Sequence, residues 1–127
     1  MSGFSFGARS LKNLEGVHPA LVGVMQEAIK RTPIDFSIIE GLRTPERQRQ
    51  LVAAGASRTL NSRHLTGHAV DIAPYVNGEI RWDWPLYNQI APVIMKVADE
   101  KKVAMVWGGS WKMRDGPHFE LSRKVYK

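Results

Sequence analysis

The apolar residues of the chain follow a helical period in two regions. The first covers residues 19–31, where apolar side chains recur every three or four positions behind an initial proline, and the Thr32-Pro33 pair predicts its end. The second begins near residue 86 and reaches about residue 101. A helix-interior proline costs about 3 kcal/mol, so Pro92 predicts a kink or a late start in this second helix.

Runs of apolar and β-branched residues predict the strands of the chain: 36–43, 69–75, 103–107 and 117–121. An Asn-Gly pair soon after the second run predicts a tight hairpin turn. Thr44 is a good helix cap, and a third helix is expected from there to Gly55, followed by a loop over residues 56–63. Because helices and short strands are mixed along the chain, the sequence predicts an α+β fold, a small, mostly antiparallel sheet with helices packed on it.

Length and cysteine content restrict the kinds of protein and site that remain. The 127 residues are enough for one domain with a single core and too few for two, so a single domain over residues 1–127 is expected. The chain has no cysteine, which excludes disulfides, thiolate metal sites and cysteine nucleophiles. A metal ion must therefore be held by His, Asp or Glu.

Charge and hydropathy favour an anionic partner and argue against a membrane segment. The net charge is +6, from 18 Lys and Arg against 12 Asp and Glu. Since the basic residues are scattered and not clustered with aromatic ones, no nucleic-acid partner is expected. No apolar run approaches the roughly 20 residues that span a bilayer, so no membrane insertion is expected. The opening MSGFSFGARSLKNLEG lacks the continuous apolar stretch of a secretory signal, so export is expected to need another protein.

An aspartate interrupts the apolar run of the second predicted strand. In AVDIA (69–73), Val70 and Ile72 share one face of the strand, and Asp71 lies on the other face between two alanines. Burying an unpaired carboxylate is costly, so a neutralising group is expected beside Asp71. A metal ion, a cationic side chain or a substrate would serve.

Two histidines can reach the same place as Asp71. Alternation in the strand 117–121 directs His118 and Glu120 away from the core, and His64 lies on the loop that enters the strand of Asp71. Two neutral imidazoles and one carboxylate, with a fourth position left to water, are typical of a catalytic zinc site. A nearby carboxylate should take a proton from that water and pass it to the departing amine. Asp115, three residues before His118, is the candidate.

The spacing of these residues resembles that of a known group of zinc peptidases. Ser62-x-His64-x-x-Gly67-x-Ala69-x-Asp71, followed by Asp115-x-x-His118, is similar to the motif of the enzymes related to D-Ala-D-Ala carboxypeptidases and the hedgehog fold. Within this group the chain resembles phage endolysins of the L-alanyl-D-glutamate endopeptidase type. The likeness covers essentially the whole chain, including FSFGARSLKNL near the start and the segments 41–48, 69–80 and 107–121.

The resemblance implies a role for each motif residue. It implies His64, Asp71 and His118 as zinc ligands, Asp115 as the general base and acid, Arg43 as the cation that stabilises a tetrahedral oxyanion, and Ser62 as a substrate contact. The implied cofactor is Zn²⁺. The implied fold is a small antiparallel sheet with helices packed on it, in agreement with the periodicity of the chain.

The resemblance also implies an activity and a place of action. The expected enzyme is a monomeric zinc metalloendopeptidase that hydrolyses the stem peptides of peptidoglycan, at the bond between L-Ala and D-Glu, for host cell lysis. Such endolysins stay in the host cytoplasm until a holin opens the inner membrane and releases them to the periplasm and cell wall. A bacterial housekeeping or prophage copy is a further possibility.

Other interpretations of the same residues stay open at this point. A D-Ala-D-Ala carboxypeptidase or dipeptidase would share the metal ligands and differ in its pocket loops. A non-catalytic zinc-containing binding module would hold the ion without turnover, although the intact Asp115 argues against it. A basic nucleic-acid-binding domain would show steep salt dependence toward DNA and no sensitivity to chelators.

Two of the implied site residues also have simpler structural interpretations. Asp115 is the first residue of an Asp-Gly pair, which is common in turns, and Arg43 can be a surface residue ahead of the next helix.

Four further residues have two alternative roles each. His68 is expected at the rim of the site or in a structural role, because Gly67 and the following strand argue against a helical pair of ligands with the earlier histidine. Glu120 either bonds a metal-binding histidine or faces solvent. Trp107 and Trp111 either line a substrate groove or belong to the core.

Overall fold

The computed structural model describes residues 3–57, 59–112 and 114–127. In chain order the described elements are α1 (Ala8–Asn13), α2 (Pro19–Arg31), β1 (Phe36–Glu40), α3 (Pro45–Ala53), the 3₁₀ turn η1 (Arg63–Thr66), β2 (Ala69–Val76), β3 (Glu79–Ile80), α4 (Trp84–Glu100), β4 (Met105–Trp107), the 3₁₀ turn η2 (Gly108–Ser110) and β5 (His118–Leu121). This combination confirms the predicted α+β class.

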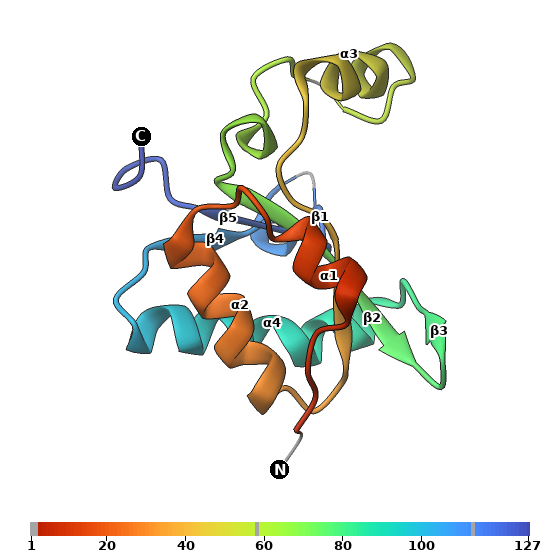
Figure 1. The fold of residues 1–127 in the computed structure, drawn as a ribbon, viewed down its shortest axis with the longest axis vertical. Helices are drawn as coiled ribbons and strands as arrows, with labels where there is room; N and C mark the ends of the chain where they lie inside the picture. Colours follow the sequence, from red (N-terminus) through yellow and green to blue (C-terminus); the bar gives the residue numbers. More distant parts are fainter. Residues whose placement is uncertain (1–2, 58, 113) are drawn as a thin grey trace.

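The strands pair in the order β1-β2-β5-β4, and β3 pairs with the end of β2 (Figure 1). Every pairing is antiparallel, as the sequence predicts. The central strand β2 sets the register of the site, since Asp71 lies opposite His118 on β5 and opposite Glu40 on β1. Residues from three distant parts of the chain therefore meet at the middle of the sheet.

Helices α2 and α4 pack against each other and against one face of the sheet to form the core (Figure 1). The apolar alternation of β2 and β5 is confirmed by the fully buried side chains Val70, Ile72, Phe119 and Leu121. The apolar face predicted for α2 is buried as well: Leu21, Val24, Met25, Ala28 and Ile29. Full burial of each large apolar side chain contributes about 1.5–3 kcal/mol, so this layer provides the main stabilisation of the sheet.

The helix α1 was not predicted, because its six residues are too few to show a period. It is held by the outer strand β1. The hydroxyl of Ser10 accepts a hydrogen bond from the backbone N–H of Ile38 at 3.0 Å, and the amide of Asn13 donates to the carbonyl of Ile38 at 2.8 Å. Packing of α1 therefore covers the outer edge of the sheet, where backbone groups need partners.

Two strands are shorter than predicted, each for a local reason. β1 ends at Glu40 and not at residue 43, because the backbone N–H of Arg43 bonds to the carbonyl of His64 in η1 at 2.9 Å and not to β2. β4 begins at Met105 and not at residue 103, because Lys102 takes a left-handed φ of 58° where α4 ends. The predicted hairpin is confirmed between β2 and β3, where Asn77 and Gly78 form the turn with φ values of 52° and 82°.

The second long helix, α4, passes through Pro92 without a late start. Pro92 and Asn88 are both exposed, so the backbone carbonyl of Asn88, which loses its helical partner at Pro92, lies at the surface, where water can reach it.

Figure 1 shows α3 beyond the end of the sheet, away from α2 and α4. The predicted loop over 56–63 contains residue 58, which lies outside the described residues, as does residue 113. Among the described residues, no helix has the length and apolar content needed to cross a membrane.

Candidate metal centre and active site

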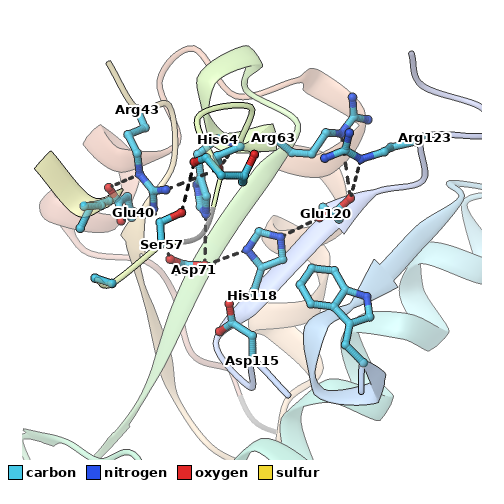
Figure 2. A pocket seen from close by; sticks show the side chains of 15 residues that line it. Glu40, Arg43, Ser57, Arg63, His64, Asp71, Asp115, His118, Glu120 and Arg123 are labelled. Atoms are coloured by element: carbon cyan, nitrogen blue, oxygen red, sulfur yellow. Dashed lines mark hydrogen bonds and ion pairs between the residues drawn. The ribbon is translucent and has the colours of Figure 1, made fainter. Parts of the chain in front are cut away.

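The structure brings together the three side chains predicted as metal ligands. Asp71 extends from β2, His118 from the facing residue of β5, and His64 from η1 (Figure 2). Oδ1 of Asp71 lies 3.2 Å from Nε2 of His64 and 3.2 Å from Nδ1 of His118. One ligand atom from each residue lies within 4.8 Å of the other two.

The geometry of this cluster fits a divalent metal ion. Ligand atoms that surround a tetrahedral ion at about 2.0–2.2 Å are separated by about 3.3 Å. The observed separations of 3.2 Å are close to that value. Imidazole nitrogen and carboxylate oxygen bind zinc and several other first-row ions, so these donors point to a metal without specifying which one.

A backbone contact fixes the ring of His64. Its Nδ1–H donates to the carbonyl oxygen of Gly41 at 2.9 Å, which leaves Nε2 facing the other two ligands. A Cβ at Gly41 would lie 1.9 Å from the carbonyl oxygen of Asn13, so only glycine lets the end of β1 come this close to α1. Ser62 caps η1 by accepting a hydrogen bond from the backbone N–H of His64 at 3.2 Å. The orientation of His64 is therefore built into the backbone.

A side-chain contact fixes the ring of His118. Its Nε2–H donates to Oε1 of Glu120 at 2.9 Å, which directs Nδ1 toward Asp71. Glu120 is buried, and its other oxygen lies 4.0 Å from Nε of Arg63 and 3.8 Å from Nε of Arg123 (Figure 2). Of the two alternatives for Glu120, the contact with a histidine is therefore the one observed.

The charges of the cluster favour a deprotonated Asp71 and a protonated His118 in the absence of a metal. Burial alone would raise the pKa of Asp71, but hydrogen bonds from His118 and His64 outweigh it and hold the pKa well below its usual range. Burial alone would lower the pKa of His118, but hydrogen bonds to Asp71 and Glu120 raise it to about 9. The metal-free cluster thus carries a proton at a position that a cation can occupy.

Asp115 lines the same pocket, in the turn before β5, and lies near His118 (Figure 2). Its backbone N–H donates to the carbonyl of Gly108 at 2.9 Å, and its own carbonyl accepts from the backbone N–H of His118 at 3.2 Å. A Cβ at Gly108 would lie 2.5 Å from the Asp115 carbonyl oxygen, so glycine is needed for this close turn. Desolvation and the nearby charge of Asp71 raise the pKa of the Asp115 carboxyl.

Arg43 is buried at the opposite side of the cluster and makes several contacts. Its guanidinium donates to both carboxylate oxygens of Glu40 at 2.8 and 2.7 Å and to the amide oxygen of Gln48 at 2.7 Å. It also lies 3.4 Å from the hydroxyl of Ser62 and 3.8 Å from Oδ2 of Asp71. The structure thus places Arg43 and Ser62 at the pocket, and their roles toward a substrate remain predictions.

The pocket encloses about 400 Å³ beside the cluster. One wall comes from α3 and the loop after it, and Trp111 stands on the other wall with its ring 5.1 Å from the ring of His118. Trp107 packs on Phe119 in the core instead. His68 does not line this pocket and lies beside Thr66, with its Nδ1 2.6 Å from the Thr66 hydroxyl. His68 is therefore not among the three clustered side chains.

Residues that support the site and were not predicted from the sequence include Glu40 and Arg63, which line the pocket, and Gln48, which accepts a hydrogen bond from Arg43. Gln48 is the buried residue of α3, and its amide holds the following loop through the Ser57 hydroxyl at 2.8 Å and the Thr59 carbonyl at 2.5 Å. The sequence offered no signal for Gln48, because α3 has no apolar face that would mark its buried side. Glu40 was not singled out because it is the last residue of a strand, and Arg63 because it directly precedes the predicted ligand His64.

Comparison with known proteins decides the family. Residues 1–127 match the sequence model of the family described as phage L-alanyl-D-glutamate peptidase. The chain belongs to this family. Among phage L-alanyl-D-glutamate peptidases, the enzyme of Escherichia phage T5 is 34% identical over 127 residues, which cover 97% of this chain and 93% of that one. The enzyme of Listeria phage A118 is 35% identical over 94 residues, covering 73% of this chain and 32% of that one.

Solved structures confirm the DD-peptidase-like fold that the resemblance implied. The crystal structure of the L-Ala D-Glu endopeptidase ChiX from Serratia marcescens superposes with a TM-score of 0.92 at 48% identity, over 98% of this chain and 94% of that one. The D,D-dipeptidase VanXYg, solved with a D-Ala-D-Ala phosphinate analogue, gives a TM-score of 0.54 at 17% identity, over 83% of this chain and 50% of that one. The second likeness is one of fold alone.

Proposed function

We propose that this chain is a single-domain, zinc-dependent endopeptidase that cleaves the bond between L-Ala and D-Glu in peptidoglycan stem peptides. The observation that carries the proposal is the meeting of His64, Asp71 and His118 in one pocket, with ligand atoms within 4.8 Å of one another. Family membership supports the reaction, and the names of the T5, A118 and ChiX relatives support the bond.

Three pocket residues besides the proposed ligands have a part in the proposed reaction. When bound, a zinc ion would act as a Lewis acid on the scissile carbonyl and lower the pKa of water to about 7. Asp115 takes a proton from the attacking water and delivers it to the leaving nitrogen, and its raised pKa makes the carboxylate a stronger base for the first of these transfers. Arg43 stabilises the oxyanion with an N–H that turns from Ser62 toward the substrate, and Ser62 contacts the substrate beside it.

Metal analysis combined with digestion of purified muropeptides tests the proposal. The wild-type protein is expected to contain one zinc ion and to release a peptide with a new N-terminal D-Glu, as read by mass spectrometry. His64→Ala is expected to lose both metal and activity. Asp115→Asn is expected to keep the metal and lose about 10²–10⁴-fold in rate, the usual contribution of general acid–base catalysis.

The outcomes of this experiment separate the alternatives. Loss of a terminal D-Ala would show a carboxypeptidase or dipeptidase specificity instead. Bound metal without any cleavage would show a binding module. Cleavage by Asp115→Asn at the wild-type rate would show that another group moves the proton.

We further propose that the enzyme acts as an endolysin, reaching the wall from the host cytoplasm after a holin opens the inner membrane. The phage relatives support this role, whereas the Serratia enzyme comes from a bacterium. Expression in the cytoplasm is expected to leave cells intact until a pore-forming protein is added, and then to lyse them in a chelator-sensitive way. Cells that stay intact after pore formation would contradict the lytic role. Such a result would not affect the proposed peptidase activity, which the muropeptide digestion tests separately.

A further inference from the structure

The two proposed imidazole ligands are oriented by different means. His64 is held by the carbonyl of Gly41 at 2.9 Å, a backbone group that no side-chain substitution removes. His118 is held by the carboxylate of Glu120 at 2.9 Å. Glu120 and His118 are two residues apart on β5, so their side chains extend from the same face of the sheet. Truncating a side chain can therefore remove the hydrogen-bond acceptor of His118, whereas the acceptor of His64 is a backbone carbonyl.

Glu120 is itself fixed by its surroundings. Its second oxygen faces two guanidinium groups, with Nε of Arg63 at 4.0 Å and Nε of Arg123 at 3.8 Å. Arg63 is buried and tied to the end of the chain, because its Nη2 donates to the carbonyls of Leu121 and Tyr126. Nε of Arg63 has no hydrogen-bond partner within the described residues, so its main interaction is the electrostatic attraction to the carboxylate of Glu120. A carboxylate in these surroundings is neutralised by cations and serves as an acceptor.

We propose that Glu120 is a positioning residue that holds His118 in the one tautomer and ring orientation able to bind the metal. Because a carboxylate accepts and does not donate, Nε2 keeps its hydrogen when the ring is neutral, and the lone pair of Nδ1 then faces the site next to Asp71. A half-turn of the unheld ring would take Nδ1 away from Asp71. This inference rests on the proposed metal site and adds the group that prepares it.

Metal affinity, measured by competition with a chelating dye above about pH 9, where the ring of His118 is neutral with or without Glu120, tests the inference without any substrate. Glu120→Leu removes the acceptor while filling similar space, and it is expected to weaken metal binding about 10–100-fold, the usual loss when the partner of a ligand is removed. Glu120→Gln keeps an acceptor oxygen and is expected to lose less. Glu79→Gln, at an exposed glutamate of β3, is the matched control and is expected to change nothing.

Circular dichroism and thermal unfolding show whether each variant is folded. A folded Glu120→Leu protein with wild-type affinity would overturn the inference. A long-range ¹H–¹⁵N spectrum of the zinc-loaded wild type provides a test that needs no variant. The hydrogen of His118 is expected on Nε2, and a hydrogen on Nδ1 would overturn the inference even if Glu120→Leu fails to fold.

The same measurements distinguish this inference from the proposed function. If the wild-type protein binds metal, Glu120→Leu weakens that binding and no muropeptide is cleaved, the positioning role stands and the activity does not. If the wild type cleaves the expected bond and Glu120→Leu binds metal normally, the activity stands and the positioning role does not.

Discussion

Metal binding is expected to release about one proton from the metal-free protein at pH 7. Hydrogen bonds to Asp71 and Glu120 overcome the effect of burial and raise the pKa of His118 to about 9. Nδ1 of His118, which faces Asp71, is therefore protonated at pH 7 when no metal is bound. A metal ion that binds there must displace this proton, so binding and deprotonation are coupled.

The loss of metal affinity caused by this proton follows from the difference between the pKa of His118 and the pH of the measurement. A pKa about two units above pH 7 weakens the apparent affinity about 100-fold at pH 7, which is about 2.7 kcal/mol at about 1.4 kcal/mol per unit. Affinity should rise about tenfold between pH 7 and pH 8, because the proton is displaced more easily as pH increases. The increase should level off above about pH 9, where the imidazole of the metal-free protein is already neutral.

Isothermal titration calorimetry in buffers with different ionisation enthalpies measures the proton directly. The slope of observed enthalpy against buffer enthalpy at pH 7 should correspond to about one proton per metal. Glu120→Leu should reduce the slope, because it removes one of the hydrogen bonds that raise the pKa of His118. A slope near zero, together with an affinity that is flat between pH 7 and pH 8, would refute this reasoning.

Three further predictions concern stability. Gly41→Ala places a Cβ 1.9 Å from the Asn13 carbonyl oxygen and is expected to lose at least about 1–3 kcal/mol in urea unfolding. Gly23→Ala, in α2 with nothing within 4 Å of the new Cβ, should instead gain about 0.4–1 kcal/mol, and equal effects at the two glycines would contradict the packing described for Gly41. Gln48→Leu should cost about 1–3 kcal/mol in the same assay, because the buried guanidinium of Arg43 and the carbonyl of Thr59 each lose a hydrogen bond, and an unchanged midpoint would show that water replaces the amide. Zinc at 100 times its dissociation constant should stabilise the wild-type protein by about 2.7 kcal/mol and a chelator should reverse the gain, whereas a melting temperature insensitive to zinc would mean that the folded state does not bind it.

The sequence predicted the layers of the fold because their signals are strong and local. The periods of α2 and α4 and the alternation in β2 and β5 depend on burial alone, and the structure buries the residues they indicated. The six residues of α1 gave no such signal, since this helix depends on hydrogen bonds to Ile38, 25 and 28 positions along the chain. Strand ends were also less predictable, because Arg43 bonds to the backbone of His64 and not to β2, and because Lys102 takes a left-handed backbone conformation.

The candidate site was predictable where spacing carried the information. Motif spacing and strand alternation placed His64, Asp71 and His118 within reach of one another, and the register of β2 with β5 does bring them together. The partners that orient these residues were harder to foresee. Glu120 had two equal alternatives until its 2.9 Å contact with His118 decided between them, and the carbonyl of Gly41 has no side chain to mark it.

The most direct test of the central claim is a crystal structure of the zinc-loaded protein with anomalous data collected at the zinc edge. The account predicts one anomalous peak, about 2.0–2.2 Å from Nε2 of His64, Oδ1 of Asp71 and Nδ1 of His118. A peak at other residues, or the absence of a peak from crystals grown with excess zinc, would contradict it.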